Sequence, residues 1–72
     1  MSLSEKINIL LEKRKLSQNV LADSLSMSIE SFNNKLHWGS FNFEEMEKIA
    51  TKFNSKYRVV EWFELNDTGE EI

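Results

Sequence analysis

One short stretch near the middle of the chain concentrates side chains that could recognise the edges of nucleic-acid bases. An asparagine amide can pair with N6 and N7 of adenine through two hydrogen bonds, a glutamate can accept a hydrogen bond from N4 of cytosine, and an isoleucine can contact the thymine methyl group. All three residue types occur within one turn and a half of a possible helix. The candidates, with a lysine and a histidine that follow them, are Ile29, Glu30, Asn33, Asn34, Lys35 and His37.

Catalytic and metal-binding chemistry has few residues to draw on. His37 is the only histidine and the chain has no cysteine, so neither a histidine cluster, a thiolate metal site nor a disulfide is available within one chain. The sequence contains no glycine-rich phosphate loop and no nucleophile with a base at a recognisable spacing. We therefore expect no enzyme activity, no metal and no cofactor, and no small-molecule ligand is evident.

The elements that would position these side chains are two short helices in the segment 16–39. Ser17 and Ser28 can each cap the start of a helix, with only a tight turn at Ser26 and Met27 before the second cap. Apolar residues recur at helical spacing after both caps, so each helix has one buried and one exposed face. These apolar positions are Val20, Leu21, Leu25, Phe32 and Leu36, with the small Ala22 beside them.

This pattern resembles the Cro and phage-repressor (XRE-type) helix-turn-helix proteins. The resemblance covers roughly residues 5–54 and is carried by 16–18, Leu21-Ala22, the Ser28 cap, Phe32 and the acidic helix that begins at 43. It implies a mainly α domain of four helices with a C-terminal β-strand or hairpin. The family usually has Gly at the turn, where Ser26 stands here, and Gln, Arg or Lys where Ile29 and Glu30 stand here.

The resemblance also implies a function and the residues that carry it. The helix 28–37 would enter the major groove of double-stranded DNA, and a dimer would bind half-sites about one helical turn apart, as a sequence-specific transcriptional regulator. Gln18 would touch phosphate or brace Glu30 or Asn33. Apart from the resemblance, we expect Trp38, just before Gly39, to cover the following loop, with contact to a sugar or base as the alternative. The expected DNA-binding residues are Ser17, Gln18, Ser28, Ile29, Glu30, Asn33, Asn34, Lys35 and His37.

Helices are expected on both sides of this motif. The first runs from about Ser4 to Arg14 with Ser4 as its cap, and it ends in the basic cluster 13–15, which either complements the helix dipole or contacts phosphate. The last begins at Asn42, where Glu45 completes a capping box and Phe41 is placed to pack on Met46. Its face 46, 49, 50 and 53 is apolar.

From Lys56 the hydrophobic period changes from 3.6 towards 2. The pattern predicts a strand over 57–65, a turn at 66–69 and a short return strand over 70–72. We accordingly divide the chain into a helix-turn-helix region, 1–55, and a hairpin, 56–72. Because an exposed strand edge invites pairing, this segment is expected to form a homodimer through Val60, Trp62 and Phe63, unless it packs as a lid on its own helices.

Charge divides unevenly along the 72 residues. Five basic and four acidic residues precede Ser40, which gives +1, whereas four basic and eight acidic residues follow, which gives −4. A net charge of −3 is unusual for a DNA-binding domain. It keeps open an alternative, that the scaffold binds a protein, as an antitoxin or a small phage-encoded inhibitor does. With no long apolar stretch and no signal peptide, we expect a single cytoplasmic domain.

Overall fold

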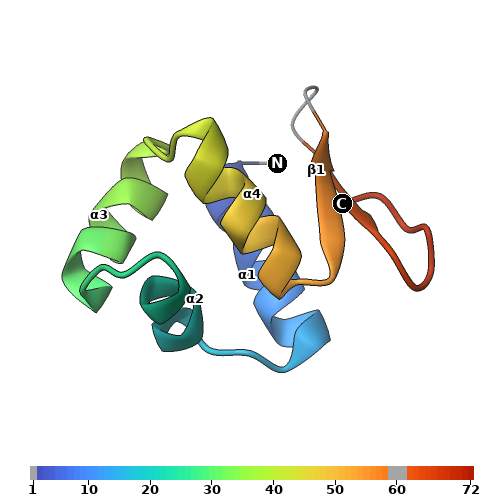
Figure 1. Ribbon diagram of the computed structural model, residues 1–72, viewed down its shortest axis with the longest axis horizontal. Helices are drawn as coiled ribbons and strands as arrows, with labels where there is room; N and C mark the ends of the chain where they lie inside the picture. The colour runs from blue at the N-terminus through green and yellow to red at the C-terminus, as the bar shows by residue number, and fades with distance from the viewer. Residues whose placement is uncertain (1, 59–61) are drawn as a thin grey trace.

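The computed structural model describes residues 2–58 and 62–72. Four helices are followed by a small antiparallel hairpin, which confirms the expected mainly α class (Figure 1). The pair α2 and α3 lies at one end of the long axis and the hairpin at the other. The elements are α1 (Leu3–Arg14), α2 (Gln18–Ser24), α3 (Ile29–Trp38), α4 (Phe43–Lys52), β1 (Ser55–Arg58) and β2 (Trp62–Leu65).

Three of the four helix starts were predicted correctly. Ser17, Ser28 and Asn42 all cap their helices, and Glu45 completes the expected capping box at Asn42. The prediction that Ser4 caps α1 is wrong, because Ser2 does so and the helix begins at Leu3. The reason is local: Ser2 has an acid three residues on, Glu5, with which it forms a reciprocal capping box.

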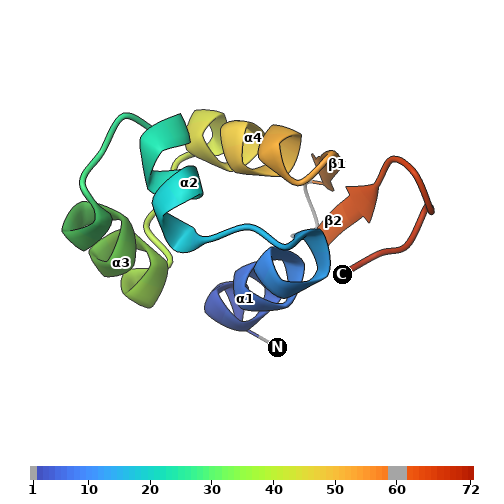
Figure 2. The same cartoon turned by 90° about the horizontal axis from the view of Figure 1, so that it is seen from below.

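A single apolar cluster joins the four helices to β2. It includes every apolar position that the helical spacing predicted as buried on α3 and α4, and β2 adds Phe63 and Leu65. Figure 2 shows β2 at the opposite end of the molecule from α3. Phe41 packs against this cluster, with its ring centroid 5.5 Å from that of Phe32. The fully buried side chains are Ile7, Leu10, Leu21, Phe32, Ile49, Phe53 and Phe63, all at 0% exposure.

The segment expected as one strand over 57–65 is instead two strands. Tyr57 pairs with Phe63 and Arg58 with Trp62 in antiparallel register, so the chain reverses direction between 58 and 62. In this register an odd-numbered residue always pairs with an odd-numbered residue, and an even-numbered residue with an even-numbered one. An alternating pattern therefore runs through the reversal without interruption, and periodicity cannot distinguish this hairpin from a single long strand.

The turn at 66–69 and the return segment are confirmed. Phe63 and Ile72 exchange two backbone N–H···O bonds of 2.9 Å, and the Leu65 amide donates to the Glu70 carbonyl. A bridge also pairs Glu64 with Glu71. The tail 70–72 thus covers the edge of β2 that faces away from β1.

A polar contact anchors this hairpin to the end of α1. The Arg14 guanidinium binds both carboxylate oxygens of Asp67, at 2.8 and 2.9 Å, while its Nε donates to the Phe53 carbonyl at 2.8 Å. Lys13 pairs with Glu70 at 2.8 Å. Hydrogen bonding from Arg14 lowers the pKa of Asp67 to about 2 from an ordinary value of 3.8. Two residues of the basic cluster 13–15 therefore bind the C-terminal turn.

The depressed pKa of Asp67 predicts an acid-sensitive contribution to stability. A carboxyl whose pKa is lower in the folded state stabilises the fold above its unfolded pKa, near 3.8, and loses that contribution as pH falls through about 2. We expect Asp67→Asn to lower Tm at pH 7, and the difference from wild type to shrink between pH 4 and 2.

Thermal unfolding followed by circular dichroism across that pH range measures the difference. Glu71→Gln is the matched control, since Glu71 is exposed and makes no ion pair within the described residues. An equal, pH-independent loss of Tm in both variants would contradict the role given to Asp67.

Candidate nucleic-acid interface

A tight left-handed turn sets α3 against α2. Ser26 has φ 56°, its N–H donates to the Asp23 carbonyl at 3.0 Å, and the Met27 N–H donates to the Ala22 carbonyl at 3.0 Å. These two bonds form a Schellman motif, which ends α2 abruptly. Ser26 therefore adopts the conformation for which glycine is favoured.

The face of α3 that points away from the core is polar and accessible. Phe32 and Leu36 turn inward, whereas the residues at i, i+3, i+4 and i+7 from Glu30 are all exposed. Ile29, the first residue of the helix, is 37% exposed. The structure thus brings four of the predicted reading residues together at the N-terminal part of one surface: Ile29, Glu30, Asn33 and Asn34.

Lys35 does not join this outward face. Its Nζ lies 2.8 and 3.0 Å from the two carboxylate oxygens of Glu45, so the side chain connects α3 to α4. The same carboxylate accepts the Asn42 N–H at 3.0 Å in the capping box. The pKa of Glu45 is lowered, mainly by the hydrogen bond from Lys35 and to a smaller extent by the hydrogen bond from the Asn42 N–H. The only lysine of α3 is therefore neutralised within the protein.

The side chains of the two caps, Ser17 and Ser28, and of Gln18 all make hydrogen bonds within the protein. The hydroxyls of Ser17 and Ser28 accept backbone N–H groups from the first turns of their helices. The expected bracing of Glu30 or Asn33 by Gln18 is wrong: its Nε2 donates to Asn8 Oδ1 on α1 at 3.3 Å. Gln18 therefore fixes α2 against α1 instead of supporting α3.

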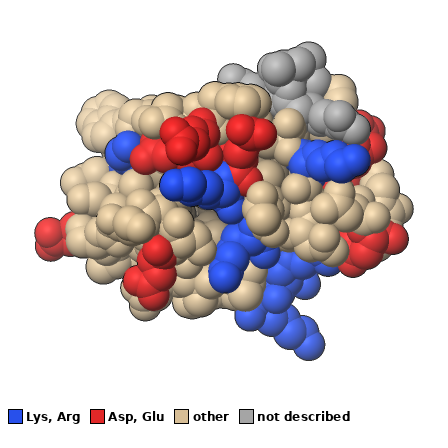
Figure 3. Space-filling model, in the orientation of Figure 1, with Lys and Arg blue, Asp and Glu red and all other residues tan. Residues whose placement is uncertain are grey.

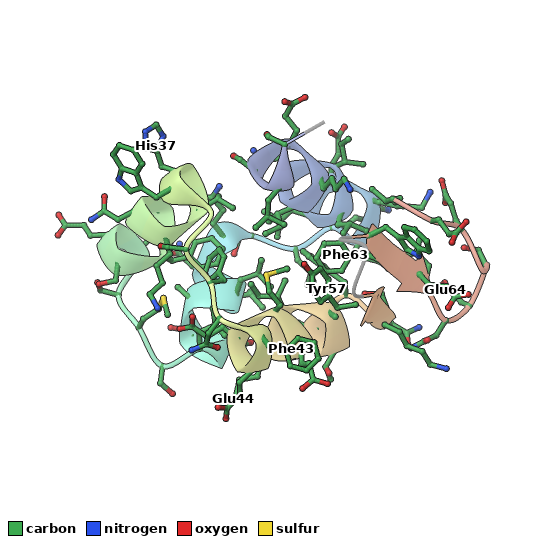
Figure 4. All side chains as sticks on the ribbon, turned by 90° about the horizontal axis from the view of Figure 1, so that it is seen from above. His37, Phe43, Glu44, Tyr57, Phe63 and Glu64 are labelled. Carbon is green, nitrogen blue, oxygen red and sulfur yellow. The ribbon has the colours of Figure 1, made fainter. Side chains whose placement is uncertain are left out.

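The end of α3 carries two exposed aromatic side chains. Trp38 is 77% exposed, so the prediction that it covers the following loop is wrong. Gly39 ends the helix at φ 63° without help from the indole. His37 stacks edge-on against Trp38, with ring centroids 4.9 Å apart, and points away from the body of the protein (Figure 4).

Ion pairs connect the two oppositely charged halves of the sequence. Lys13, Arg14 and Lys35, all from the basic half, pair with Glu70, Asp67 and Glu45 from the acidic half. The surface over α3 is mostly uncharged in the view of Figure 3, and acids gather over α4. The described residues thus give no continuous basic face around α3.

Trp62 and Phe63, two of the residues expected to form a dimer, lie on β2, at the far end of the molecule from α3. Phe63 is fully buried and Trp62 half-buried, while Val60 falls outside the described residues. The expectation of an open edge at Trp62 and Phe63 is wrong, because β2 has β1 on one side and the tail 70–72 on the other. Among the described strands, β1 has β2 on one side and no strand on the other. Phe43 of α4 lies beside Tyr57 of β1, with ring centroids 6.4 Å apart.

Other kinds of site find little support. Within 2–58 and 62–72, no three acidic or histidine side chains come together as a metal site, and no helix is long and apolar enough to cross a membrane. An open hollow on α4 is lined by mixed charges and hydroxyls, from Ser24, Glu44, Glu47, Lys48, Thr51 and Lys52.

The sequence interpretation missed the Lys35–Glu45 pair. Ten positions separate the two residues, so no helical spacing connects them. The capping box at Asn42 was the available signal, because it fixes the Glu45 carboxylate at the start of α4, next to the end of α3.

Comparison of the chain with protein-family models, with curated proteins and with solved structures finds no match.

The left-handed Ser26 predicts a stabilising substitution. Removing its Cβ relieves a conformation that costs an L-residue about 1–2 kcal/mol, partly offset by the greater freedom of glycine in the unfolded chain. We expect Ser26→Gly to stabilise the fold by about 0.5–1 kcal/mol and to raise Tm by a few degrees.

Thermal or urea unfolding measures this change, with Ser31→Gly as the matched control. Ser31 is exposed within α3, so glycine there should lower stability by roughly 0.5–1 kcal/mol. Destabilisation by both substitutions would show that the turn does not favour glycine.

Proposed function

We propose that this protein is a sequence-specific DNA-binding transcriptional regulator of the Cro or phage-repressor type. In this mechanism α3 lies in the major groove and α2 crosses the backbone above it. Binding would act by occupancy of an operator, and such a regulator works in the cytoplasm. No part of the mechanism requires catalysis or a cofactor.

The observation that carries the proposal is the exposed stripe on α3. Glu30, Asn33 and Asn34 face away from the core on the helix that follows the tight turn. The asparagine amides can donate hydrogen bonds to base edges and accept them, and the glutamate carboxylate can accept them. The apolar side chains on the opposite side of α3, Phe32 and Leu36, are buried in the core. The exposed N–H groups at the start of α2 can serve phosphate oxygens.

Weak positive charge makes a dimer part of the proposal. Phosphate contacts by Lys and Arg supply most non-specific affinity, and three of the cations here are paired internally. A second subunit doubles the number of contacts and would place two copies of α3 on successive turns of the duplex.

A second candidate function is a protein-interaction module on the same scaffold. The observation that favours it is the exposure of two aromatic side chains, Trp38 at 77% and Phe43 at 57%, on a chain of net charge −3. Aromatic residues are enriched in protein interfaces, and acids repel DNA. A regulator and an interaction module differ in their response to DNA and salt.

Titration of labelled duplexes therefore tests the proposal. We expect the DNA upstream of the protein's own gene to bind more tightly than a scrambled duplex, with affinity falling steeply as salt rises. Fluorescence anisotropy across a salt series measures both effects, and light scattering of the complex is expected to give two chains per duplex. Failure to bind either duplex at about 50 mM salt, where phosphate contacts are strong, would reject DNA binding.

Release of Lys35 gives a sharper prediction. Glu45→Gln removes the carboxylate but keeps a side chain that can complete the capping box. We expect tighter binding to specific and scrambled DNA alike, and a salt dependence steeper by about one phosphate contact.

Glu47→Gln is the matched control, because it removes one exposed charge from α4 whereas the described ion pair of Lys35 is with Glu45. If the affinity for DNA rises equally in both variants, the change in net charge accounts for the increase and Lys35 has no role in binding.

A further inference from the structure

The outward face of α3 offers hydrogen-bonding groups without an available cation. The helix has no arginine, and its only lysine is held by both oxygens of Glu45 at 2.8 and 3.0 Å. With 35% of the Lys35 side chain and 17% of the Glu45 side chain exposed, the pair is partly shielded from water. Lys35 therefore faces α4 and is not aimed at a ligand on the outer face.

This arrangement removes the commonest partner of guanine. Guanine presents two acceptors in the major groove, O6 and N7, and proteins usually read them with the two donors of an arginine or with a lysine. Glu30 is exposed on the same stripe, and its carboxylate repels acceptors of this kind. The N-terminal half of α3 therefore disfavours guanine at the positions it faces.

The exposed side chains in the N-terminal half of α3 suit adenine and thymine. Asn33 and Asn34 are adjacent and exposed, and each amide can pair with N6 and N7 of adenine. Ile29 exposes an apolar surface at the first position of the helix, where it can meet a thymine methyl group. Glu30 can accept from the amino group of adenine or cytosine, both of which are donors.

We infer that α3 selects A·T base pairs: adenine through Asn33 and Asn34, thymine through Ile29, and at most one cytosine through Glu30. The inference rests on the proposed DNA binding and adds which bases are read. It predicts half-sites in which α3 contacts no guanine at O6 or N7.

Selection from randomised duplexes at low salt, with the full chain, tests this inference first. We expect the bound duplexes to share half-sites rich in A·T pairs. Each selected site is then remade with 7-deazaadenine or, separately, with 7-deazaguanine, since each analogue removes only the N7 acceptor of its base. Replacing adenine should weaken binding about tenfold, and replacing guanine should leave the Kd unchanged.

Variants assign the effect to α3. In Asn33→Ala/Asn34→Ala the sensitivity to 7-deazaadenine should disappear, whereas Asn19→Ala, a change of an exposed asparagine on α2, should retain it. Ile29→Ala should remove the loss that follows replacement of thymine by uracil, which lacks the methyl group. Thermal melting of each variant checks its fold, and the analogue duplexes test the wild-type protein without any substitution.

The outcomes distinguish a wrong base preference from a failure of DNA binding itself. Selected sites that lose affinity with 7-deazaguanine but not with 7-deazaadenine would overturn the base preference while DNA binding stands. Recovery of no duplex from the pool, with no binding to the upstream DNA, would overturn both.

Discussion

None of the helices in this protein is long enough to persist alone in water. They span 12, 7, 10 and 10 residues, and isolated helices shorter than about 12–15 residues are marginal. The structure therefore depends on one shared apolar cluster, to which all four helices and β2 contribute. The chain has no disulfide to supplement it. Because α3 belongs to the same cluster through Phe32 and Leu36, its exposed face is fixed by the packing of its buried one.

The ends of the helices contribute a second, local constraint. Only α3 ends at a glycine, while Lys15, Ser26 and Asn54 adopt left-handed conformations at or just after the ends of α1, α2 and α4. A side chain in this region is costly, least so for asparagine. Core packing thus maintains turns that the local sequence alone would favour less strongly. This explains how the chain makes sharp helix junctions with only two glycines.

Sequence patterns predicted the helical part well because its signals are local. Hydroxyl and amide caps identified three helix starts, and the 3.6-residue period identified the buried faces of α3 and α4. The hairpin was misread because pairs such as Tyr57–Phe63 and Arg58–Trp62 preserve the alternation between the two strands, and the sequence between Arg58 and Trp62 has no glycine, proline or asparagine to indicate a turn. The exposed stripe of α3 was also predictable from spacing. The partners of Lys35, Arg14 and Gln18 were not, because each contact joins different elements and depends on tertiary geometry.

The Glu45 carboxylate has two tasks, since it completes the cap of α4 and also neutralises Lys35. These tasks are thermodynamically linked. An anion that draws Lys35 away leaves Glu45 with the Asn42 amide as its remaining partner among these contacts, and the pKa of that carboxyl must then rise. Anion binding at α3 is therefore opposed by the electrostatic stabilisation of the α4 N-terminus. By the same linkage, any affinity of α3 for anions would depend on protonation of Glu45, a group on a different helix, and acid would strengthen such binding by weakening the Lys35–Glu45 pair that competes with it.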